Sequence, residues 1–401
     1  MSKKMRSDFL ILGSGIIGLS IALELKNRFP DCSVTVLDKE KKCGVHGSGR
    51  NSGVLHAGFY YTADSLKARF CRDGNKALTE YCLDNDLAIN QCGKLVVAKN
   101  ELELHGLNEL YQRGVENDVD LRIVDQKQAR EIEPLVKTFH KAIYSPSTST
   151  IDPDQVISSL FRDARDKGVK FKFSTCYLSN DNGVIRTNHG DFHAGYVVNA
   201  AGLYADTIAH DYGFALDLRI LPFKGLYLYA NVNACNLKTH VYPVPNLNHP
   251  FLGVHFTISV DGMIKIGPTA IPALWRENYH GFSKFKFQEM LEILSTELSL
   301  FFKSDFDFRK LAIKECQKYF RPHLVGLASQ LLEGVQLQDY RTWGAPGIRA
   351  QLYDSKQRKL VMDFCVEGNE KTFHVLNAVS PAFTASIPFA KYCCNKIEQF
   401  M

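Results

Sequence analysis

Residues 9–18 read FLILGSGIIG, and this stretch decides the fold. An apolar strand runs directly into a glycine turn, and a helical pattern follows the turn. The three glycines have separate roles: Gly13 permits a tight reversal, Gly15 lets the backbone approach a pyrophosphate, and Gly18 lets the helix pack on the strand. We therefore predict a strand, a phosphate-binding turn and a helix in this order.

The start of this helix and the end of the next strand extend the pattern. The first helical N–H groups, on Ile16 and Ile17, have no partner within the helix and lie at the positive end of its dipole. A second apolar strand, residues 33–37, ends at Asp38, about twenty residues after the glycine turn, where a carboxylate can bind a ribose hydroxyl. Lys39 beside it is a further candidate contact. Together these features predict dinucleotide binding.

Length and composition are those of an ordinary globular protein with room for two domains. The chain has 401 residues, of which 45% are hydrophobic and 23% charged. Its net charge of +5 is too small for the basic footprint of a nucleic-acid-binding protein. The 11 cysteines include no C-x-x-C pair, so we expect no metal site. No stretch resembles a signal peptide or reaches the roughly eighteen apolar residues of a membrane span, so we expect a cytoplasmic protein.

The nucleotide-binding pattern is interrupted after the second strand, because insertions separate its later pieces. We predict an α/β protein in which a discontinuous Rossmann-type domain is interleaved with an α+β substrate domain built on an antiparallel sheet. The predicted nucleotide-binding domain comprises residues 1–90, 145–212 and 340–401, and the predicted substrate domain comprises residues 91–144 and 213–339. The expected helices cover residues 65–85, 101–117, 153–167, 204–212 and 284–318, and the expected strands include 94–98, 169–173, 196–202 and several between 220 and 267.

Three pieces far apart in the sequence favour FAD over a nicotinamide cofactor. The loop at 48–53 can lie beside the pyrophosphate, the small residues at 200–202 allow close approach to a buried cofactor, and a helix starting near Pro381 can direct its positive end at the flavin. Each piece taken alone is equally a tight turn, a core strand or a helix cap, so only the combination indicates FAD. The residues expected to contact the cofactor from these distant parts of the chain are Ser48, Arg50, Asn51, Ser52, Gly202, Arg349, Ser380, Pro381 and Ala382.

Six further segments form a specific set of motifs. They are NSGVLHAGFYY at 51–61, CGKLVVA at 92–98, PFKG at 222–225, FLGVHFT at 251–257, GIRAQ at 347–351 and NAVSPA at 377–382. In this order they resemble the L-2-hydroxyglutarate dehydrogenase/oxidase family, which belongs to the D-amino-acid-oxidase-like flavoproteins. The resemblance implies FAD, oxidation of L-2-hydroxyglutarate or a similar 2-hydroxy acid to the 2-oxo acid, and transfer of the electrons to a quinone or to oxygen.

Two positions depart from the pattern of that family. Arg50 stands where the family usually has histidine, and Lys224 stands where it often has arginine. A guanidinium is permanently charged and cannot act as a base, so Arg50 is expected to serve phosphate or flavin. A lysine cannot form a bidentate fork with a carboxylate, so Lys224 is expected to hold a substrate less firmly than arginine.

Oxidation of a 2-hydroxy acid requires a base for the hydroxyl proton and cations for the carboxylates. Imidazole suits the base role because its pKa lies near neutral pH, and either His56 or His255 is the predicted base, with a structural histidine as the alternative. Apolar residues alternate around His255, so its side chain is expected to point away from the apolar face. Arg349 is expected to clamp a carboxylate, with a surface ion pair as the alternative. Secondary candidates for the distal carboxylate, whose alternative role is packing, are Tyr60, Tyr61, Tyr242 and Lys224.

Two other functions compete with hydroxy-acid oxidation. A related flavoprotein could oxidise an amine or an amino acid, and a non-catalytic protein could bind flavin as a regulator. The concentration of His56, His255 and Arg349 in motifs argues against the regulator. The pattern assigns neither the electron acceptor nor the oligomeric state.

One aromatic and basic stretch suggests contact with a membrane surface. Residues 282–287 read FSKFKF and residues 300–303 read LFFK. Phe306, Phe308, Arg309 and Lys310 continue this composition. On one face these side chains form a patch suited to anionic lipid headgroups, as in a peripheral protein on the inner face of the cell membrane. The alternative is a set of helices that bury their aromatic residues in the core.

Overall fold

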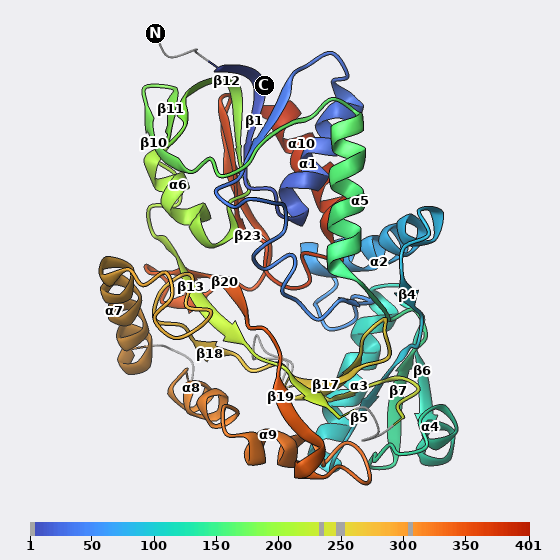
Figure 1. Ribbon diagram of the computed structural model, residues 1–401. Helices are drawn as coiled ribbons and strands as arrows, with labels where there is room; N and C mark the ends of the chain where they lie inside the picture. The colour runs from blue at the N-terminus through green and yellow to red at the C-terminus, as the bar shows by residue number, and fades with distance from the viewer. Residues whose placement is uncertain (1–4, 232–235, 246–252, 304–307) are drawn as a thin grey trace. The chain divides into compact units, whose positions relative to one another are not determined.

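The chain passes repeatedly between two structural units (Figure 1). The structure, a computed structural model, describes residues 5–231, 236–245, 253–303 and 308–401. Unit 1 comprises Met1–Asn51, Pro153–Pro222 and Arg349–Met401, and unit 2 comprises Ser52–Asp152 and Phe223–Ile348. Each unit is therefore assembled from segments that are distant in the sequence.

Unit 1 is built on a parallel sheet with β1 (Met5–Leu12) at its centre. β1 pairs in parallel with β2 (Val34–Leu37) and with β12 (Gly190–Asn199). The outer parallel strands are β9 (Lys170–Lys172), next to β2, and β23 (Thr372–Asn377), next to β12. Residues 9–12 are buried because the strands of a parallel sheet are covered on both faces. Shorter antiparallel strands in this unit are β10 (Tyr177–Asp181), β11 (Val184–Thr187), β21 (Lys359–Leu360) and β22 (Cys365–Gly368).

Three helices pack together beside this sheet. α1 (Ile16–Arg28) contacts both α5 (Pro153–Asp166) and α10 (Ser386–Phe400) (Figure 1). Arg28 Nη1 donates to Glu398 Oε2 at 3.0 Å, which ties the end of α1 to α10. The other helical elements of unit 1 are the 3₁₀ turn η1 (Gly202–Tyr204) and α6 (Ala205–Asp211). The helix that follows the glycine turn is thus held between helices from two later segments.

Unit 2 is built on an eight-stranded mixed sheet with the order β19-β14-β17-β16-β15-β5-β7-β6. Neighbouring strands are antiparallel except for β15 and β5, which are parallel. The strands are β5 (Lys94–Val97), β6 (Arg122–Asp125), β7 (Lys141–Ser145), β14 (Leu228–Ala230), β15 (His240–Pro243), β16 (His255–Ile258), β17 (Ile264–Gly267) and β19 (Tyr340–Trp343). The sheet therefore joins strands from both segments of unit 2.

The remaining elements of unit 2 are helices and short strands. The helices are α2 (Leu66–Asp84), α3 (Glu101–Glu116), α4 (Gln126–Ile132), α7 (Phe287–Lys303), α8 (Phe308–Gln317), α9 (Arg321–Ala328) and the 3₁₀ turn η2 (Leu337–Asp339). β3 (Val54–Leu55), β8 (Ser149–Ile151) and β4 (Ile89–Asn90) form a three-stranded sheet. β13 (Leu218–Gly225) and β20 (Gly347–Asp354) run from one unit into the other, and β18 (Ile271–Pro272) pairs with the part of β13 in unit 2.

The two faces of the eight-stranded sheet differ in chemistry. One face carries apolar side chains such as Phe256 and Ile266, which pack in a cluster with residues of α4 and α9. The opposite face packs in part on α3 and on the loop at residues 57–61. Because successive side chains of a strand point to opposite faces, the polar residues that alternate with the apolar set share this second face.

Most of the predicted elements are confirmed. The helices expected at 65–85, 101–117, 153–167 and 204–212 and the strands expected at 94–98 and 169–173 agree with the structure within one residue at each end. The helical stretch expected at 284–318 contains α7 and α8 in the structure. Residues 304–307, between these two helices in the sequence, lie outside the described residues.

The boundaries of the two units differ from the predicted domain boundaries. Residues 52–90 and 145–152 belong to unit 2, because β3 and β4 both pair with β8. Residues 340–348 also belong to unit 2, since β19 pairs with β14 in the large sheet. Residues 213–222 belong to unit 1, where Ile220 N donates to buried Asp206 Oδ2 at 2.8 Å.

Candidate functional site

The glycine turn of unit 1 leaves no space for side chains. Gly13 has a φ of +108°, and a Cβ there would lie 2.5 Å from the carbonyl oxygen of Ala200. A Cβ on Gly18 would lie 1.9 Å from the carbonyl oxygen of Gly13, and a Cβ on Gly15 would lie 3.0 Å from Ser48 Oγ. Gly13 and Gly18 are therefore restricted to glycine by backbone that lies too close for a Cβ, whereas Gly15 is packed tightly against the Ser48 side chain.

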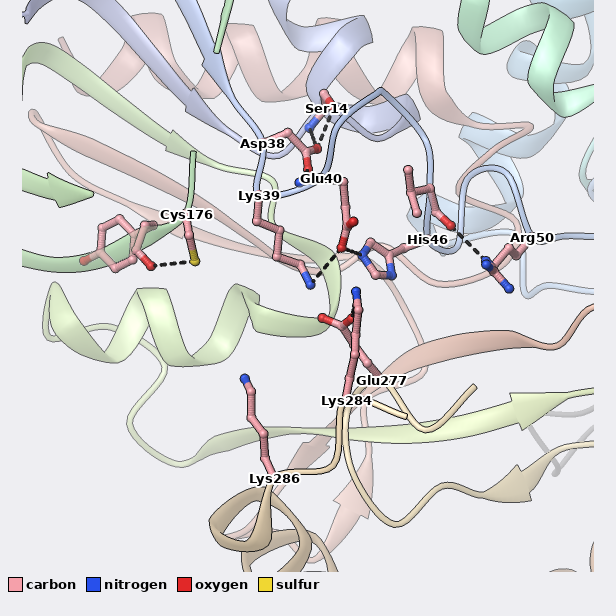
Figure 2. Close-up of polar contacts among 12 residues, drawn as sticks. Ser14, Asp38, Lys39, Glu40, His46, Arg50, Cys176, Glu277, Lys284 and Lys286 are labelled. Carbon is pink, nitrogen blue, oxygen red and sulfur yellow. Dashed lines mark hydrogen bonds and ion pairs between the residues drawn. The ribbon is translucent and has the colours of Figure 1, made fainter. Parts of the chain in front are cut away.

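Asp38 lies at the end of β2 and is bound to the glycine turn. Its Oδ2 accepts hydrogen bonds from Ser14 N at 2.8 Å and from Ser14 Oγ at 2.5 Å (Figure 2). Its Oδ1 accepts a hydrogen bond from Glu40 N at 2.8 Å. An ionised carboxylate has about four acceptor positions, so these three bonds leave capacity for a ribose hydroxyl.

A charged cluster follows Asp38. Glu40 Oε1 lies 3.4 Å from Lys39 Nζ and 3.0 Å from His46 Nε2 (Figure 2). The Lys39 ammonium also lies 4.9 Å from the centre of the Tyr204 ring. Glu40 and His46 were not predicted as site residues, because neither belongs to a spacing pattern in the sequence. The cluster places Lys39 near the carboxyl end of β2, where ligands of parallel sheets bind.

The second glycine-rich loop folds over the start of α1. Ser48 Oγ accepts a hydrogen bond from Ile16 N at 2.9 Å, and Asn51 Nδ2 donates to Ser48 O at 2.5 Å. Arg50 Nε donates to Val45 O at 2.9 Å (Figure 2). The structure thus brings Ser48, Arg50 and Asn51 together with the glycine turn within unit 1. Their contact with a cofactor remains a prediction.

The C-terminal pieces of unit 1 agree only in part with the sequence. Gly202 has a φ of +57° and starts the turn η1, and Arg349 is half-buried on β20. The helix start expected at Ser380, Pro381 and Ala382 is wrong, because these residues form a turn and α10 begins at Ser386. Pro388 explains the difference, since a helix from 381 would place proline in its interior, where it has no N–H to donate. The dipole argument therefore applies to Ser386 and not to Pro381.

The polar face of the unit 2 sheet carries a row of buried titratable residues. The register pairs Lys94 with His240 and Thr257 with Lys265, and it places His255 opposite Gly267. All lie on the face opposite Phe256. We call this set the polar row; its members are Lys94, His240, Tyr242, His255, Thr257 and Lys265, and all are buried.

His255 is held in a defined orientation and protonation pattern. Its Nδ1 lies 3.0 Å from the carbonyl oxygen of Gly253, which can only accept, so Nδ1 carries the proton of the neutral ring and Nε2 carries the lone pair. Its ring stacks on Tyr242 with centroids 3.7 Å apart and an interplanar angle of 14°. The side chain points away from the apolar face, as the alternation of residues predicts. A lone pair on Nε2 is what a proton-abstracting histidine requires.

The other predicted substrate-side residues lie in different parts of unit 2. His56 follows β3 and is buried. Lys224 Nζ donates to Asn278 Oδ1 at 3.3 Å, and burial lowers the pKa of Lys224. Burial raises the pKa of Tyr60 well above its usual value and also raises the pKa of Tyr242, so both phenols stay protonated. Phe251 and Leu252 of the FLGVHFT motif lie outside the described residues.

Four members of the polar row were not predicted as site residues: Lys94, His240, Thr257 and Lys265. Burial lowers the pKa of Lys94 to about 7 and the pKa of Lys265 to about 8. Burial, together with the charges of these two lysines, lowers the pKa of His240 to about 3. His240 Nδ1 accepts a hydrogen bond from Ile258 N at 3.1 Å, so His240 is a neutral, structural histidine. The alternation in Ile264-Lys265-Ile266 was the available signal, since it places a lysine on a buried strand.

The residues of unit 1 fit the pyrophosphate and ribose of a dinucleotide. A Cβ at Gly13 or Gly18 would clash with backbone, Gly15 at the N-cap of α1 has no side chain to block a ligand, and Asp38 has spare acceptor capacity. None of the helices in the described part of the chain has the length and apolar character of a membrane span.

Comparisons with known proteins agree with this geometry. The family model described as FAD dependent oxidoreductase matches residues 8–395. The mitochondrial L-2-hydroxyglutarate dehydrogenase of Homo sapiens is 35% identical, covering 98% of this chain and 89% of that protein. The L-2-hydroxyglutarate dehydrogenase of Escherichia coli K12 is 33% identical, covering 98% of this chain and 94% of that protein.

Solved structures share the fold. The dithionite-reduced L-alpha-glycerophosphate oxidase of Mycoplasma pneumoniae, with FAD bound, has a TM-score of 0.78 at 21% identity, covering 98% of this chain and 95% of that one. The glycine oxidase of Geobacillus kaustophilus has a TM-score of 0.72 at 18% identity, covering 99% of this chain and 96% of that one. The predicted α/β fold class is therefore confirmed.

Proposed function

Because this chain belongs to the L-2-hydroxyglutarate dehydrogenase family of FAD-dependent oxidoreductases, we propose that it oxidises L-2-hydroxyglutarate to 2-oxoglutarate with FAD as its cofactor. The observation that carries this proposal is similarity along nearly the whole chain, at 33–35% identity, to dehydrogenases named for that substrate. The polar row supports it, since it contains the buried imidazole of His255 and the buried amine of Lys265, both suited to an anionic hydroxy acid.

The reaction removes a hydride from C2 and a proton from the hydroxyl group. The bound flavin supplies the hydride acceptor. His255 is the proposed base, because its Nδ1–H bond to Gly253 leaves the lone pair on Nε2. Arg349 and Lys224 are the proposed partners of the two carboxylates, with Tyr60, Tyr61 and Tyr242 as secondary candidates, and His56 is the competing base.

The cofactor is proposed to lie along the glycine turn of unit 1. Ile17 at the start of α1 is then proposed to bind the pyrophosphate, as is Ile16, whose N–H donates to Ser48 Oγ at 2.9 Å in this structure, and Asp38 and Lys39 are proposed to bind the ribose. The remaining proposed cofactor contacts are Gly13, Gly15, Gly18, Ser48, Arg50, Asn51, Ser52, Gly202, Arg349, Ser380, Pro381 and Ala382.

An anaerobic bleaching assay tests the function. The purified holoenzyme is mixed with L-2-hydroxyglutarate, D-2-hydroxyglutarate, lactate, glycine or proline, and loss of the visible flavin absorbance is followed. We expect rapid bleaching by L-2-hydroxyglutarate alone. Bleaching by the amino acids instead would replace this proposal with an amino-acid oxidase. Turnover at the wild-type rate in both His255→Ala and His56→Ala would refute the base assignment.

The electron acceptor is proposed to be a quinone or oxygen. Reoxidation of the substrate-reduced enzyme by air or by a short-chain ubiquinone separates the two. A rate with quinone far above the rate with air would identify a dehydrogenase, and the reverse would identify an oxidase.

We also propose peripheral contact between unit 2 and an anionic membrane. Exposed apolar side chains gather at α7 and the segment before it, including Phe282 with 84% of its surface exposed and Phe287 with 60%. Lys284 and Lys286 accompany them, although they pair with Glu277 and Glu289. The side chains of Phe302, Lys303 and Phe308, and the whole of Phe306, lie outside the described residues.

Co-sedimentation with liposomes tests the membrane contact. Vesicles containing phosphatidylglycerol are expected to carry the protein down, and the double variant Phe282→Ser/Phe287→Ser is expected to stay in the supernatant. Recovery of the wild-type protein in the supernatant at low salt would refute the contact. Co-sedimentation with phosphatidylcholine vesicles is the control, and it separates the electrostatic contribution to membrane binding from the apolar contribution.

A further inference from the structure

Lys94 is a buried cation enclosed by aromatic rings. It is the first residue of β5, and none of its surface is exposed. Its Nζ lies 4.6 Å from the ring centre of Phe59, 4.6 Å from that of Tyr60 and 4.9 Å from that of Tyr242. Among the described residues, Nζ has no hydrogen-bond partner. The three ring faces are therefore its principal attractive contacts.

Two of these rings, Phe59 and Tyr60, lie on a loop that is bound to the C-terminal end of α3. Phe59 and Tyr60 stack with centroids 4.5 Å apart. Their loop is held by Asn117 Nδ2, which donates to Gly58 O at 3.1 Å and to Tyr61 O at 2.9 Å. Side-chain bonds to loop carbonyls from one helix end leave the loop little freedom to move. The ammonium is thus held in a place set by the loop and by β5.

The third ring connects Lys94 to His255. β15 lies between β5 and β16 in the sheet, so Tyr242 lies between Lys94 and His255 on the polar face. Its ring is in contact with the ammonium at 4.9 Å and is stacked on the imidazole at 3.7 Å. The position of Tyr242 therefore depends on the cation on one side and determines the stacking of His255 on the other.

A merely space-filling role does not explain a lysine here. An apolar side chain of the same length would fill the cage without the cost of burying an ammonium. A cation, by contrast, attracts the faces of the rings and so sets their orientation, and this attraction is strongest away from water. The presence of lysine at position 94 is thus explained by a role for its charge and not by a role for its volume.

We propose that Lys94 is a positioning residue for His255, holding the Tyr242 ring against the imidazole so that Nε2 faces the substrate hydroxyl. The inference rests on the proposed function, in which His255 is the base. The bond from Nδ1 to Gly253 fixes the imidazole in its own plane, and the Tyr242 stack fixes the tilt of that plane. Both restraints are needed because proton transfer depends on the direction of the lone pair.

The variant Lys94→Met in the holoenzyme tests the proposal. We expect the rate of anaerobic flavin reduction by L-2-hydroxyglutarate to fall about tenfold, the scale of one desolvated cation–π contact, with little change in the substrate concentration at half-saturation. Lys76→Met on the exposed surface of α2 is the control and is expected to keep the wild-type rate. A wild-type rate in Lys94→Met would overturn the proposal.

A double-mutant cycle separates positioning from general damage. Tyr242→Leu removes the ring through which Lys94 acts, so adding Lys94→Met to Tyr242→Leu is expected to cause no further loss of rate. If the two losses multiply instead, Lys94 does not act through Tyr242.

A spectroscopic readout does not depend on turnover. NMR of the histidine rings, with His255→Gln used to assign the signal, is expected to show the ring protons of His255 shifted by the ring current of the stacked Tyr242 in the wild type, and this shift is expected to decrease in Lys94→Met. An unchanged shift would overturn the positioning role. If L-2-hydroxyglutarate is not oxidised but the ring-current shift decreases as expected, the proposed function fails and the link from Lys94 to His255 stands.

Discussion

Replacing Lys94 by methionine is expected to stabilise unit 2, more strongly at pH 7 than at pH 9. Lys94 is completely buried, and its Nζ has no hydrogen-bond partner in the part of the chain that the structure describes. Methionine has a similar length and no charge, so the cage keeps its shape while the cost of burying an ammonium disappears. The variant is therefore expected to be both slower in catalysis and harder to unfold.

The size of the effect follows from the pKa of Lys94. Burial lowers this pKa from 10.5 to about 7, and 10.5 − 7 = 3.5 units corresponds to about 5 kcal/mol against folding when the group is charged. A pKa reflects all interactions of the charged group in the folded state, so the contacts with the three rings are not counted a second time. The expected gain for Lys94→Met at pH 7 is thus at most about 5 kcal/mol.

The gain depends on pH in a defined direction. Above a pH of about 7 the folded state binds fewer protons than the unfolded state, whose lysine titrates at 10.5, so the unfolding free energy of the wild type rises with pH across this window. At pH 9 the remaining cost is 10.5 − 9 = 1.5 units, about 2 kcal/mol, so the wild type recovers about 2 kcal/mol or more between pH 7 and pH 9. The advantage of the variant is expected to fall to about 2 kcal/mol at pH 9.

Urea unfolding of the holoenzyme at both pH values measures this difference. The only two tryptophans, Trp275 and Trp343, both lie in unit 2, so their fluorescence reports on the unit that contains Lys94. Lys76→Met is the control and is expected to follow the wild type at both pH values. The reasoning would be refuted if the unfolding free energies of the wild type and Lys94→Met changed by the same amount between pH 7 and pH 9. It would also be refuted if Lys94→Met were less stable than the wild type at pH 7.

Three further predictions concern the turn and the loop. Gly18→Ala places a Cβ 1.9 Å from Gly13 O, so the purified protein is expected to lack FAD and to melt at a lower temperature; a full flavin content by absorbance would contradict this. Asp38→Ala removes the acceptor of Ser14, and the Kd for FAD, measured by quenching of flavin fluorescence, is expected to rise at least about tenfold, given about 1.5–3 kcal/mol for a hydrogen bond to a charged group. Asn117→Ala removes two hydrogen bonds to the loop at 58–61, so the unfolding free energy measured in urea is expected to fall by about 2 kcal/mol. An unchanged midpoint and slope of the urea curve would show that these two bonds do not stabilise the loop.

The sequence predicts those features of the molecule that are determined by residues close together in the chain. The turn at 13–18 is specified by three glycines within six residues, and the orientation of His255 follows from the alternation of its neighbours. The start of α10 also has a local cause, because Pro388 excludes a helix that begins at Pro381 and runs through residue 388.

The cage around Lys94 has no local cause. Its members come from positions 59–60, 94 and 242, which meet only because β15 adds to β5 in parallel. No spacing in the sequence predicts that pairing, since the two strands belong to different segments of unit 2 and residues 153–222 of unit 1 lie between those segments. The same reason explains the boundary of the units at residue 52: the pairing of β3 and β4 with β8 is a long-range event.

The packing of α1 against α10 has a consequence for biosynthesis. The phosphate-binding turn and α1 leave the ribosome early, but one side of α1 is covered only by residues 386–400, and β12 gains its partner β23 only with residues 372–377. Until those residues emerge, an apolar helix surface and a strand edge have no cover from within unit 1. We therefore expect the cofactor to bind only after nearly the whole chain has been made: a chain that stops after residue 348 would contain every residue of the glycine turn and still lack α10 and β23.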